Sequence, residues 1–184
     1  MTSVIKVDTI QNSTGTDALS IGADGSVTTQ GAFYPNGLTA WPAFSASRTT
    51  SDWYAVAGGS IIVFDRVDSP ADDYMGFNNG NHFNTSTYAF TCPIDGIYSF
   101  GFNIYTANSD AANGFSLAKN GYYLKTGSGT DINNIYVQGT DDINLAGSYT
   151  LTLSANDTID VRANTGSDIY TGHSWFHGHL VAPL

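Results

Sequence analysis

The fold class is decided by the stretch AFTCPIDGIYSFGFNI, residues 89–104. Large apolar side chains stand at every second position of its second half, at Tyr98, Phe100, Phe102 and Ile104, and the positions between them are small or polar. Successive side chains of a β-strand point to opposite faces, so this alternation predicts a strand that presents one face to a core.

The last strand that the sequence predicts is SWFHGHLV, residues 174–181, and it is apolar on both faces. Phe176, Gly178 and Leu180 alternate with a second set of side chains, which comprises Trp175, His177, His179 and Val181. Because that second face is too apolar to be left in water, we expect the strand to lie between two packed layers. One layer is the core of the domain, and the other is predicted to be a neighbouring subunit.

The rest of the chain from residue 42 reads as further short strands separated by turn signals. There are 20 glycines, 11 tyrosines and 10 phenylalanines, whereas Lys and Arg total 6 and Glu is absent, so a helical fold is disfavoured. The predicted strands are 43–47, 60–64, 88–91, 97–105, 114–119, 132–138, 148–154, 158–162 and 174–181. The predicted core consists of Phe90, Tyr98, Phe100, Phe102, Leu151, Leu153, Phe176, Gly178 and Leu180.

Residues 1–41 form a different kind of segment, with short alternating pieces and too little apolar content for a core of their own. Such a segment either stays disordered or packs against copies of itself. The regular recurrence of apolar residues, including Val4, Ile5, Val7 and Ile10, favours the second alternative, an extended β-rich arm.

Charge and cysteine content exclude several classes of protein. The net charge of −10 disfavours nucleic-acid binding, and no apolar run is long enough to insert into a membrane. The single cysteine, Cys92, cannot close an intrachain disulfide, and the first ten residues do not resemble a secretory signal.

The order of motifs over residues 43–184 resembles the C1q-like globular domain of the tumour-necrosis-factor-like jelly rolls. The resemblance rests on the pair Phe64-Asp65, the stretch 80–84, the signature 89–100, the step 151–161 and the closing strand 174–180. It implies an all-β, ten-stranded jelly-roll knob over residues 42–184 that assembles as a homotrimer. The first and last strands would lie near the three-fold axis, where Trp175, His177, His179 and Val181 would form the subunit interface.

The arm departs from complement-type relatives, because it has no Gly-X-Y repeat. Residues 4–15 and 19–27 instead resemble the opening segment of fibre, tip and capsid-fibre proteins of tailed-phage virions. This resemblance implies that the protein is located in a virion assembled in the host cytoplasm. The arm, through Val4, Ile5, Val7 and Ile10, would attach the protein to other virion proteins.

Two sets of residues are candidate metal ligands, although the fold requires no cofactor. His177 and His179 form a His-x-His pair, and three copies around an axis would present six imidazoles to a transition metal. Loop carboxylates suited to calcium occur at Asp72-Asp73 and Asp141-Asp142. The alternative in each case is a packed interface histidine or a solvated loop charge.

No catalytic motif is present, so the sequence predicts a protein without enzymatic activity. Aromatic residues in polar loops are suited to gripping a host-surface glycan or protein, and the candidates are Tyr74, Phe77, Tyr122, Tyr123, Tyr136 and Tyr170. These rings could instead cap the sheets.

Two functions remain open, a phage adhesin whose knob binds the host surface and a purely architectural capsid decoration or fibre protein. A cellular C1q-like lectin is disfavoured by the absence of a collagen-like stalk.

Overall fold

The computed structural model describes residues 9–11, 17–29, 38, 40–68, 76–107, 113–124, 135–137 and 142–184. The chain divides into two compact units, residues 1–37 and residues 38–184, and each is described by itself. Every regular element in the described residues is a β-strand. These residues contain no helix that could cross a membrane.

The first unit contains one antiparallel three-stranded sheet, in the order β1 (Thr9–Gln11), β2 (Asp17–Ile21) and β3 (Val27–Thr29). Gly25, with φ of +82°, turns the chain between β2 and β3. Ile10, Ile21 and Val27 are all exposed, so the described strands enclose no core of their own. The other predicted anchoring residues, Val4, Ile5 and Val7, lie outside the described residues.

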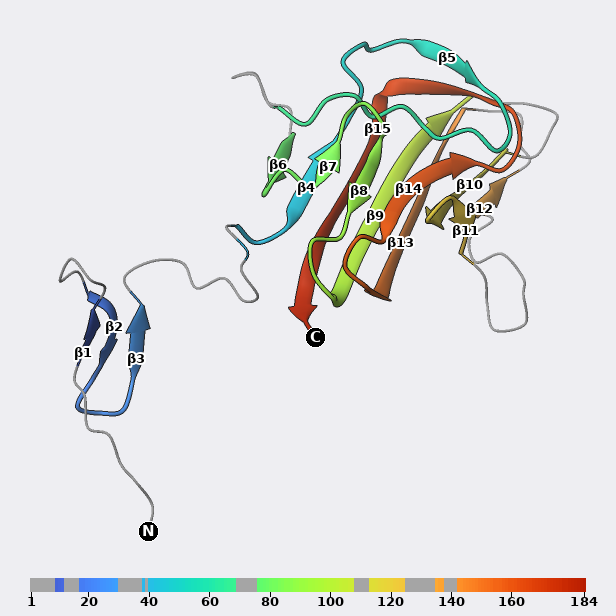
Figure 1. The fold of residues 1–184 in the computed structure, drawn as a ribbon. Helices are drawn as coiled ribbons and strands as arrows, with labels where there is room; N and C mark the ends of the chain where they lie inside the picture. Colours follow the sequence, from blue (N-terminus) through green and yellow to red (C-terminus); the bar gives the residue numbers. More distant parts are fainter. Residues whose placement is uncertain are drawn as a thin grey trace. The chain divides into compact units, whose positions relative to one another are not determined.

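The second unit, here called the knob, is a sandwich of two antiparallel sheets (Figure 1). The first sheet has the order β13 (Ile143–Leu153), β9 (Gly96–Thr106), β15 (Ser167–Pro183), β4 (Ala43–Ala46) and β6 (Phe77–Asn79), and β5 (Trp53–Val56) pairs with the start of β15. The second has the order β11 (Tyr122–Tyr123), β10 (Asn113–Lys119), β14 (Thr158–Ala163), β8 (Ala89–Thr91) and β7 (Phe83–Asn84), and β12 (Ile135–Val137) pairs with β10.

The strands differ from the sequence prediction at several places. The described knob has two six-stranded sheets, where the resemblance implies ten strands in all, and two of the described strands, β7 and β11, are only two residues long. Residues 60–64 do not form the predicted strand, since only Ile61 makes an isolated bridge, to Arg162. Leu38 and Trp41, assigned to the arm from sequence, pack against the core of the knob.

The core between the sheets is built largely from aromatic rings. Phe44 stacks on Phe83 at a centroid distance of 4.6 Å and on Phe90 at 5.2 Å, and meets Phe176 edge-on at 4.9 Å. Tyr98 is fully buried, and its hydroxyl donates to the Ile94 carbonyl at 2.9 Å. These contacts join both sheets in one cluster, which fixes the layer spacing.

The residues expected in the core are placed there with one difference. Phe90, Tyr98, Phe100, Phe102, Leu153, Phe176, Gly178 and Leu180 are buried, whereas Leu151 is half-buried. Leu151 lies on β13, which is the edge strand of its sheet in the part of the chain that the structure describes. Cys92 is also buried, and burial raises the pKa of its thiol to about 12, which leaves it protonated and unreactive at neutral pH.

Gly178 makes space for the aromatic core. A Cβ at this position would meet Phe100 Cδ1, would lie 2.7 Å from Phe100 Cε1 and would lie 2.9 Å from Phe44 Cε1. Both rings are held by other aromatic contacts, so neither can move aside cheaply. The glycine therefore lets β15 approach the stacked rings.

We predict that Gly178→Ala lowers the free energy of unfolding by about 1–3 kcal/mol, the usual cost of overpacking a core. The measurement is urea unfolding. Gly166→Ala is the control, because its added Cβ would meet only the Val56 carbonyl oxygen, at 3.6 Å. Equal stability of the two variants would contradict this account of the core.

Candidate functional site

The side of the first sheet that faces away from the core is here called the outer face. Its central row crosses the sheet from Phe77 through Ser45, His177 and Gly101 to Ser148, as the strand registers show. The next row crosses it from Asn79 through Ala43, His179 and Ser99 to Thr150. On β15, Trp175 comes before His177 and Val181 comes after His179, and both lie on the same outer face as these histidines.

The central strands of the outer face carry no charged side chain. None of the sixteen aspartates and none of the six basic residues lies between Ser174 and Val181 or at the strand positions that pair with this stretch. The described ion pairs of the knob lie elsewhere: Arg66–Asp68 follows β5, and Lys119–Asp157 and Arg162–Asp160 belong to the second sheet. The strand positions of this face are therefore uncharged, and two arginines, Arg48 and Arg66, line a pocket at its margin beside Trp175. Depletion of charge at the centre of a patch is typical of protein–protein interfaces.

Large apolar side chains are exposed on the same face. Trp175 is 43% exposed, Val181 is 49% exposed and Phe77 is 48% exposed. A shallow hollow over Gly101 separates Trp175 from Ala146 and Ser148. An exposed aromatic residue beside a hollow, on a face without charges, has the physical character of an uncovered subunit contact.

His177 and His179 point outward from β15 and are exposed. The His177 ring lies over Gly101, where an added Cβ would come within 2.7 Å of Nε2. Although the residue is exposed overall, its ring is partly desolvated where it lies over Gly101, and this desolvation, and secondarily the nearby His179, lower the pKa of His177 below its usual value of 6.5. The described residues of a single chain bring no three His, Cys, Asp or Glu side chains together as a metal cluster. A metal bound through His177 and His179 would therefore need more than one chain.

The loop carboxylates proposed for calcium are largely outside the described residues. Asp72, Asp73 and Asp141 fall there, and Asp142 is exposed just before β13. The calcium hypothesis stays a prediction.

The aromatic residues predicted to contact a receptor do not form one patch. Phe77 lies on the outer face, while Tyr122, 79% exposed, and Tyr123 lie on the β10–β11 hairpin of the second sheet. Tyr123 is engaged within the fold, because its hydroxyl donates to the Ala163 carbonyl at 3.0 Å. Tyr74 lies outside the described residues, as does the side chain of Tyr136 on β12.

Tyr170 belongs instead to a cluster of four rings at the start of β15, here called the aromatic cluster. Tyr105 lies 5.8 Å from Trp53 and 5.2 Å from His173, and Tyr170 lies 5.3 Å from Trp53 and 5.2 Å from His173, measured between ring centroids. Sequence reasoning missed this cluster, because its assembly depends on the pairing of Trp53 with Tyr170, 117 positions apart. Trp53 is 41% exposed.

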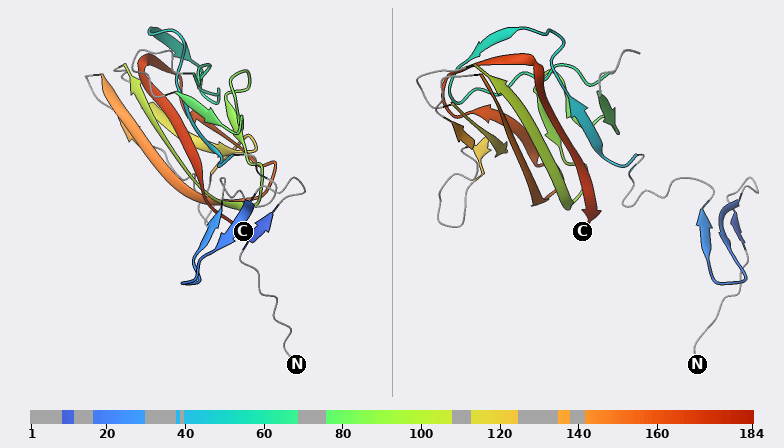
Figure 2. Two further views of the ribbon diagram at one scale, coloured as in Figure 1. Left: turned by 90° about the vertical axis from the view of Figure 1, so that its left-hand side faces the viewer. Right: turned by 180° about the vertical axis from the view of Figure 1, so that it is seen from behind.

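Strand β5, which carries Trp53 of the aromatic cluster, lies at the end of the knob remote from the C-terminus (Figures 1 and 2). At the opposite end, Trp41 Nε1 donates to the Leu180 carbonyl at 2.7 Å, so the chain enters the knob beside the end of β15. The ten residues from Tyr170 to Leu180 separate these two ends by roughly 30 Å at about 3.3 Å per residue.

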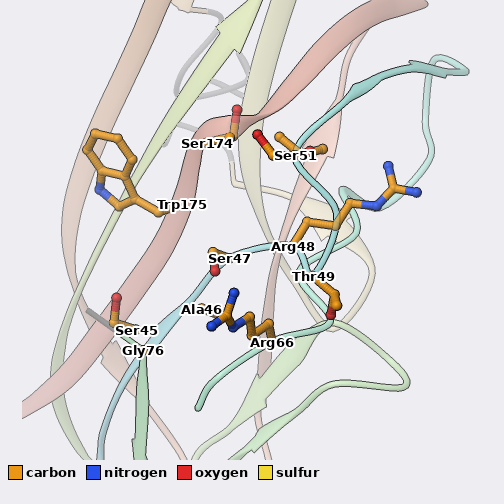
Figure 3. Close-up of a pocket in the computed structure, with 12 residues that line it drawn as sticks. Ser45, Ala46, Ser47, Arg48, Thr49, Ser51, Arg66, Gly76, Ser174 and Trp175 are labelled. Carbon is orange, nitrogen blue, oxygen red and sulfur yellow. The ribbon is translucent and has the colours of Figure 1, made fainter. Parts of the chain in front are cut away.

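A pocket of about 210 Å³ lies between the end of β4 and the middle of β15. Its side-chain lining includes Ser45, Ser47, Arg48, Arg66, Ser174 and Trp175. Figure 3 shows Trp175 on one side and Arg48, Thr49 and Ser51 on the other, with Ser47 and Arg66 between them. No residue of this pocket was singled out from sequence except Trp175, which was assigned to the subunit interface.

Two facing antiparallel sheets, with the first knob strand β4 beside the last strand β15, define the jelly-roll class of the tumour necrosis factors. The structure is similar to the globular domain of zebrafish complement 1qA, with a TM-score of 0.54, 20% identity, and coverage of 78% of this chain and 99% of that one. It is also similar to Eiger TNF from S. frugiperda, with a TM-score of 0.57, 14% identity, and coverage of 79% and 95%. For murine APRIL at pH 5.0 the TM-score is 0.53, with 8% identity and coverage of 78% and 99%.

The chain belongs to the C1q domain family, whose model matches residues 43–181. The family resemblance seen in the sequence and its all-β jelly-roll fold are thus confirmed. Domains of the C1q and TNF-like families form homotrimers and are generally non-enzymatic.

The position of His177 predicts a loss of stability at mildly acidic pH. Because its pKa is lowered in the folded chain, the unfolded chain binds more protons as the pH falls below 6.5. The free energy of unfolding is therefore not reduced by His177 above pH 6.5, and it decreases as the pH falls from 6.5 toward the lowered pKa of His177.

We expect the melting temperature of the wild-type protein to fall between pH 8 and pH 5, and the fall to be smaller in His177→Gln. Differential scanning calorimetry at half-unit intervals measures both. A parallel decline in the two proteins would show that His177 does not contribute.

Proposed function

We propose that this chain is a non-enzymatic homotrimeric structural protein of a tailed-phage virion, with a C-terminal knob that binds the host surface. The trimer is supported by the composition of the outer face. Trp175 and Val181 are exposed there in the single chain, and the strand positions around them hold no charged residue. Trp175, His177, His179 and Val181 are the proposed contact residues. Domains of this family form homotrimers, which supports the assignment of the outer face as the subunit interface.

The virion location and the role of the arm are supported by the resemblance of residues 4–27 to the opening segment of tail and capsid fibre proteins. The exposed Ile10, Ile21 and Val27 on the sheet β1-β2-β3 agree with a segment that needs a partner to cover its apolar side chains. We propose other virion proteins as that partner, and assembly in the host cytoplasm.

Adhesion is supported by the aromatic cluster, in which Trp53 and His173 are exposed, at the end of the knob remote from the point where the chain enters it. Trp and Tyr rings beside hydroxyl groups are effective contacts for both glycans and proteins. The architectural alternative assigns no ligand to these rings. A transition metal held by His177 and His179 of three chains stays a secondary proposal, and no cofactor is required.

The interface is tested by a charge on the outer face. We predict that Thr150→Asp dissociates the trimer at pH 8, because an unpaired carboxylate buried in an interface costs about 3–5 kcal/mol. Sedimentation equilibrium should give three times the chain mass of 19.5 kDa for the wild type and a shift toward 19.5 kDa for the variant.

Thr91→Asp is the matched control, since Thr91 is an exposed strand threonine on β8 of the second sheet. This variant should remain trimeric. Dissociation of both variants, or of neither, would contradict the assignment of the outer face.

Adhesion is tested by binding labelled full-length protein to the bacterial host with Trp53 intact or changed. Trp53→Ala should weaken saturable binding at least tenfold and leave the sedimentation mass unchanged, because the ring lies outside the proposed interface. The control is Thr91→Ala, at an exposed position of β8 that is not a candidate receptor contact, and it should leave host binding unchanged. An absence of saturable binding by the wild type would favour the architectural alternative.

A further inference from the structure

The aromatic cluster stands at a bulge in β15. Between Tyr170 and Trp175, β15 advances by five residues while its partner β9 moves by only two positions. The Ser174 hydroxyl fixes this bulge, because it donates to the Tyr170 carbonyl at 2.8 Å and accepts the backbone N–H of Tyr105 at 3.0 Å. Bulges bend a strand and redirect its side chains, and they are common beside active sites. The backbone that carries these rings is therefore held in place by hydrogen bonds.

Three rings of the cluster, those of Trp53, Tyr105 and Tyr170, contact one another at inclined angles. Their centroids are 5.3–6.1 Å apart, and their planes meet at 43° to 75°. Rings this close leave no room for a ligand between them, so a ligand would rest on the exposed side of the group. Trp53, which is 41% exposed, is the most accessible of the three rings.

An exposed carboxylate lies on the same side of the sheet as these rings. Asp168 precedes Tyr170 by two positions on β15, and the strand register places it opposite Ala55, as it places Tyr170 opposite Trp53. Residues two apart on a strand share a face. The Asp168 carboxylate makes no hydrogen bond or ion pair with another described residue. Aromatic faces attract cations, so the rings and this carboxylate together favour a ligand of positive charge.

The basic residue nearest to β5 in the sequence, Arg48, lies on the other side of that strand. Its guanidinium stands over the ring of Tyr54, 4.1 Å from the ring centre. Tyr54 follows Trp53 on β5, so the two rings project from opposite faces of the strand, and Tyr54 packs against the core. The net charge of −10 further favours the approach of a cation.

The bulge separates the aromatic cluster from the proposed subunit contacts along β15. The contact residues at positions 175–181 all follow the bulge, whereas Asp168 and Tyr170 precede it. Trp53 lies on β5, which pairs with β15 on the edge opposite β9. A sister subunit that covers the stretch after the bulge would leave Trp53 and Asp168 accessible. Ligand binding at the cluster and the subunit interface are therefore compatible in one trimer.

We propose that the aromatic cluster binds a quaternary ammonium group such as choline, with its methyl groups against Trp53 and Tyr170 and its charge near Asp168. The methyl groups pack against the rings, and the positive charge is attracted to the ring faces and to the carboxylate. A neutral group of the same shape would keep the ring contacts and lose this attraction. The proposal rests on the adhesive function proposed above and names the chemical group that the knob would recognise on the host surface.

The test is a saturation-transfer NMR titration of the full-length protein with choline and with its uncharged isostere 3,3-dimethyl-1-butanol, at constant ionic strength. We expect saturable transfer to the choline methyl protons and about fivefold weaker binding of the alcohol. Trp53→Ala should abolish the transfer. Asp168→Asn, with every ring intact, should weaken choline binding about threefold, because the attraction of an exposed carboxylate is modest. Circular dichroism checks that each variant is folded.

Asp95→Asn is the matched control for the loss of one carboxylate. It lies at the end of the knob that carries the C-terminus, where the Asp95 carbonyl accepts the Leu184 N–H at 3.1 Å. An asparagine can still accept the hydrogen bond that the Asp95 carboxylate accepts from the Ala155 N–H at 2.8 Å. Choline binding should be unchanged in this variant. The proposal is overturned if choline gives no saturable transfer, if the alcohol binds as tightly, or if Asp95→Asn weakens binding as much as Asp168→Asn.

The host-binding assay separates the ligand class from the adhesive function. Choline should inhibit the Trp53-dependent binding of the protein to the host. Trp53-dependent binding that choline does not inhibit would overturn this ligand class while leaving the adhesive function intact. Sedimentation of the protein with phosphatidylcholine vesicles would assign the group to a lipid, whereas choline binding without vesicle binding would assign it to an ester on another surface molecule, and either result supports the site.

Discussion

Strand β15 belongs to two packing surfaces at once, and the architecture of the knob depends on this constraint. It lies between β9 and β4 in the first sheet, so its side chains alternate between the core and the outer face. Phe176, Gly178 and Leu180 complete the aromatic core, with Gly178 leaving space for the rings of Phe100 and Phe44. The same alternation places Trp175, His177 and His179 on the outside, where they are exposed in the described part of the single chain.

Placing two apolar faces on one strand restricts where charge can lie. The described ion pairs are confined to the segment after β5 and to the second sheet, and the outer face holds small, hydroxyl and aromatic side chains. Burying such a face in a neighbouring subunit costs little desolvation, because no ion has to leave water. The outer face is therefore suited to association between copies of the chain. Of the two ends of the knob, one receives the chain beside the end of β15, and the other carries the aromatic cluster proposed to bind the host.

The sequence predicted most strands of the knob, including the short β4 and β8, but missed β5, β6, β7 and β11. The period-two pattern over Tyr98–Ile104 and Phe176–Leu180 identified β9 and β15, because each strand presents several large side chains to the core. Strands such as β5 and β6 have only three or four residues, too few to show a period. The aromatic cluster and the pocket escaped prediction for a related reason, since both are assembled by the pairing of β15 with distant segments. The wrong prediction at 60–64 arose because Ile62 and Phe64 are buried without belonging to a sheet strand.

The exposure of two tryptophans offers the most direct test of the claim that the outer face is covered by sister chains. In the single chain Trp175 is 43% exposed and Trp53 is 41% exposed, so hydroxyl radicals would oxidise them at similar rates if the protein were monomeric. Footprinting of the purified full-length protein, read by mass spectrometry, should instead show Trp175 oxidised several-fold more slowly than Trp53. Equal oxidation of the two residues would contradict the subunit interface on which the trimeric knob depends.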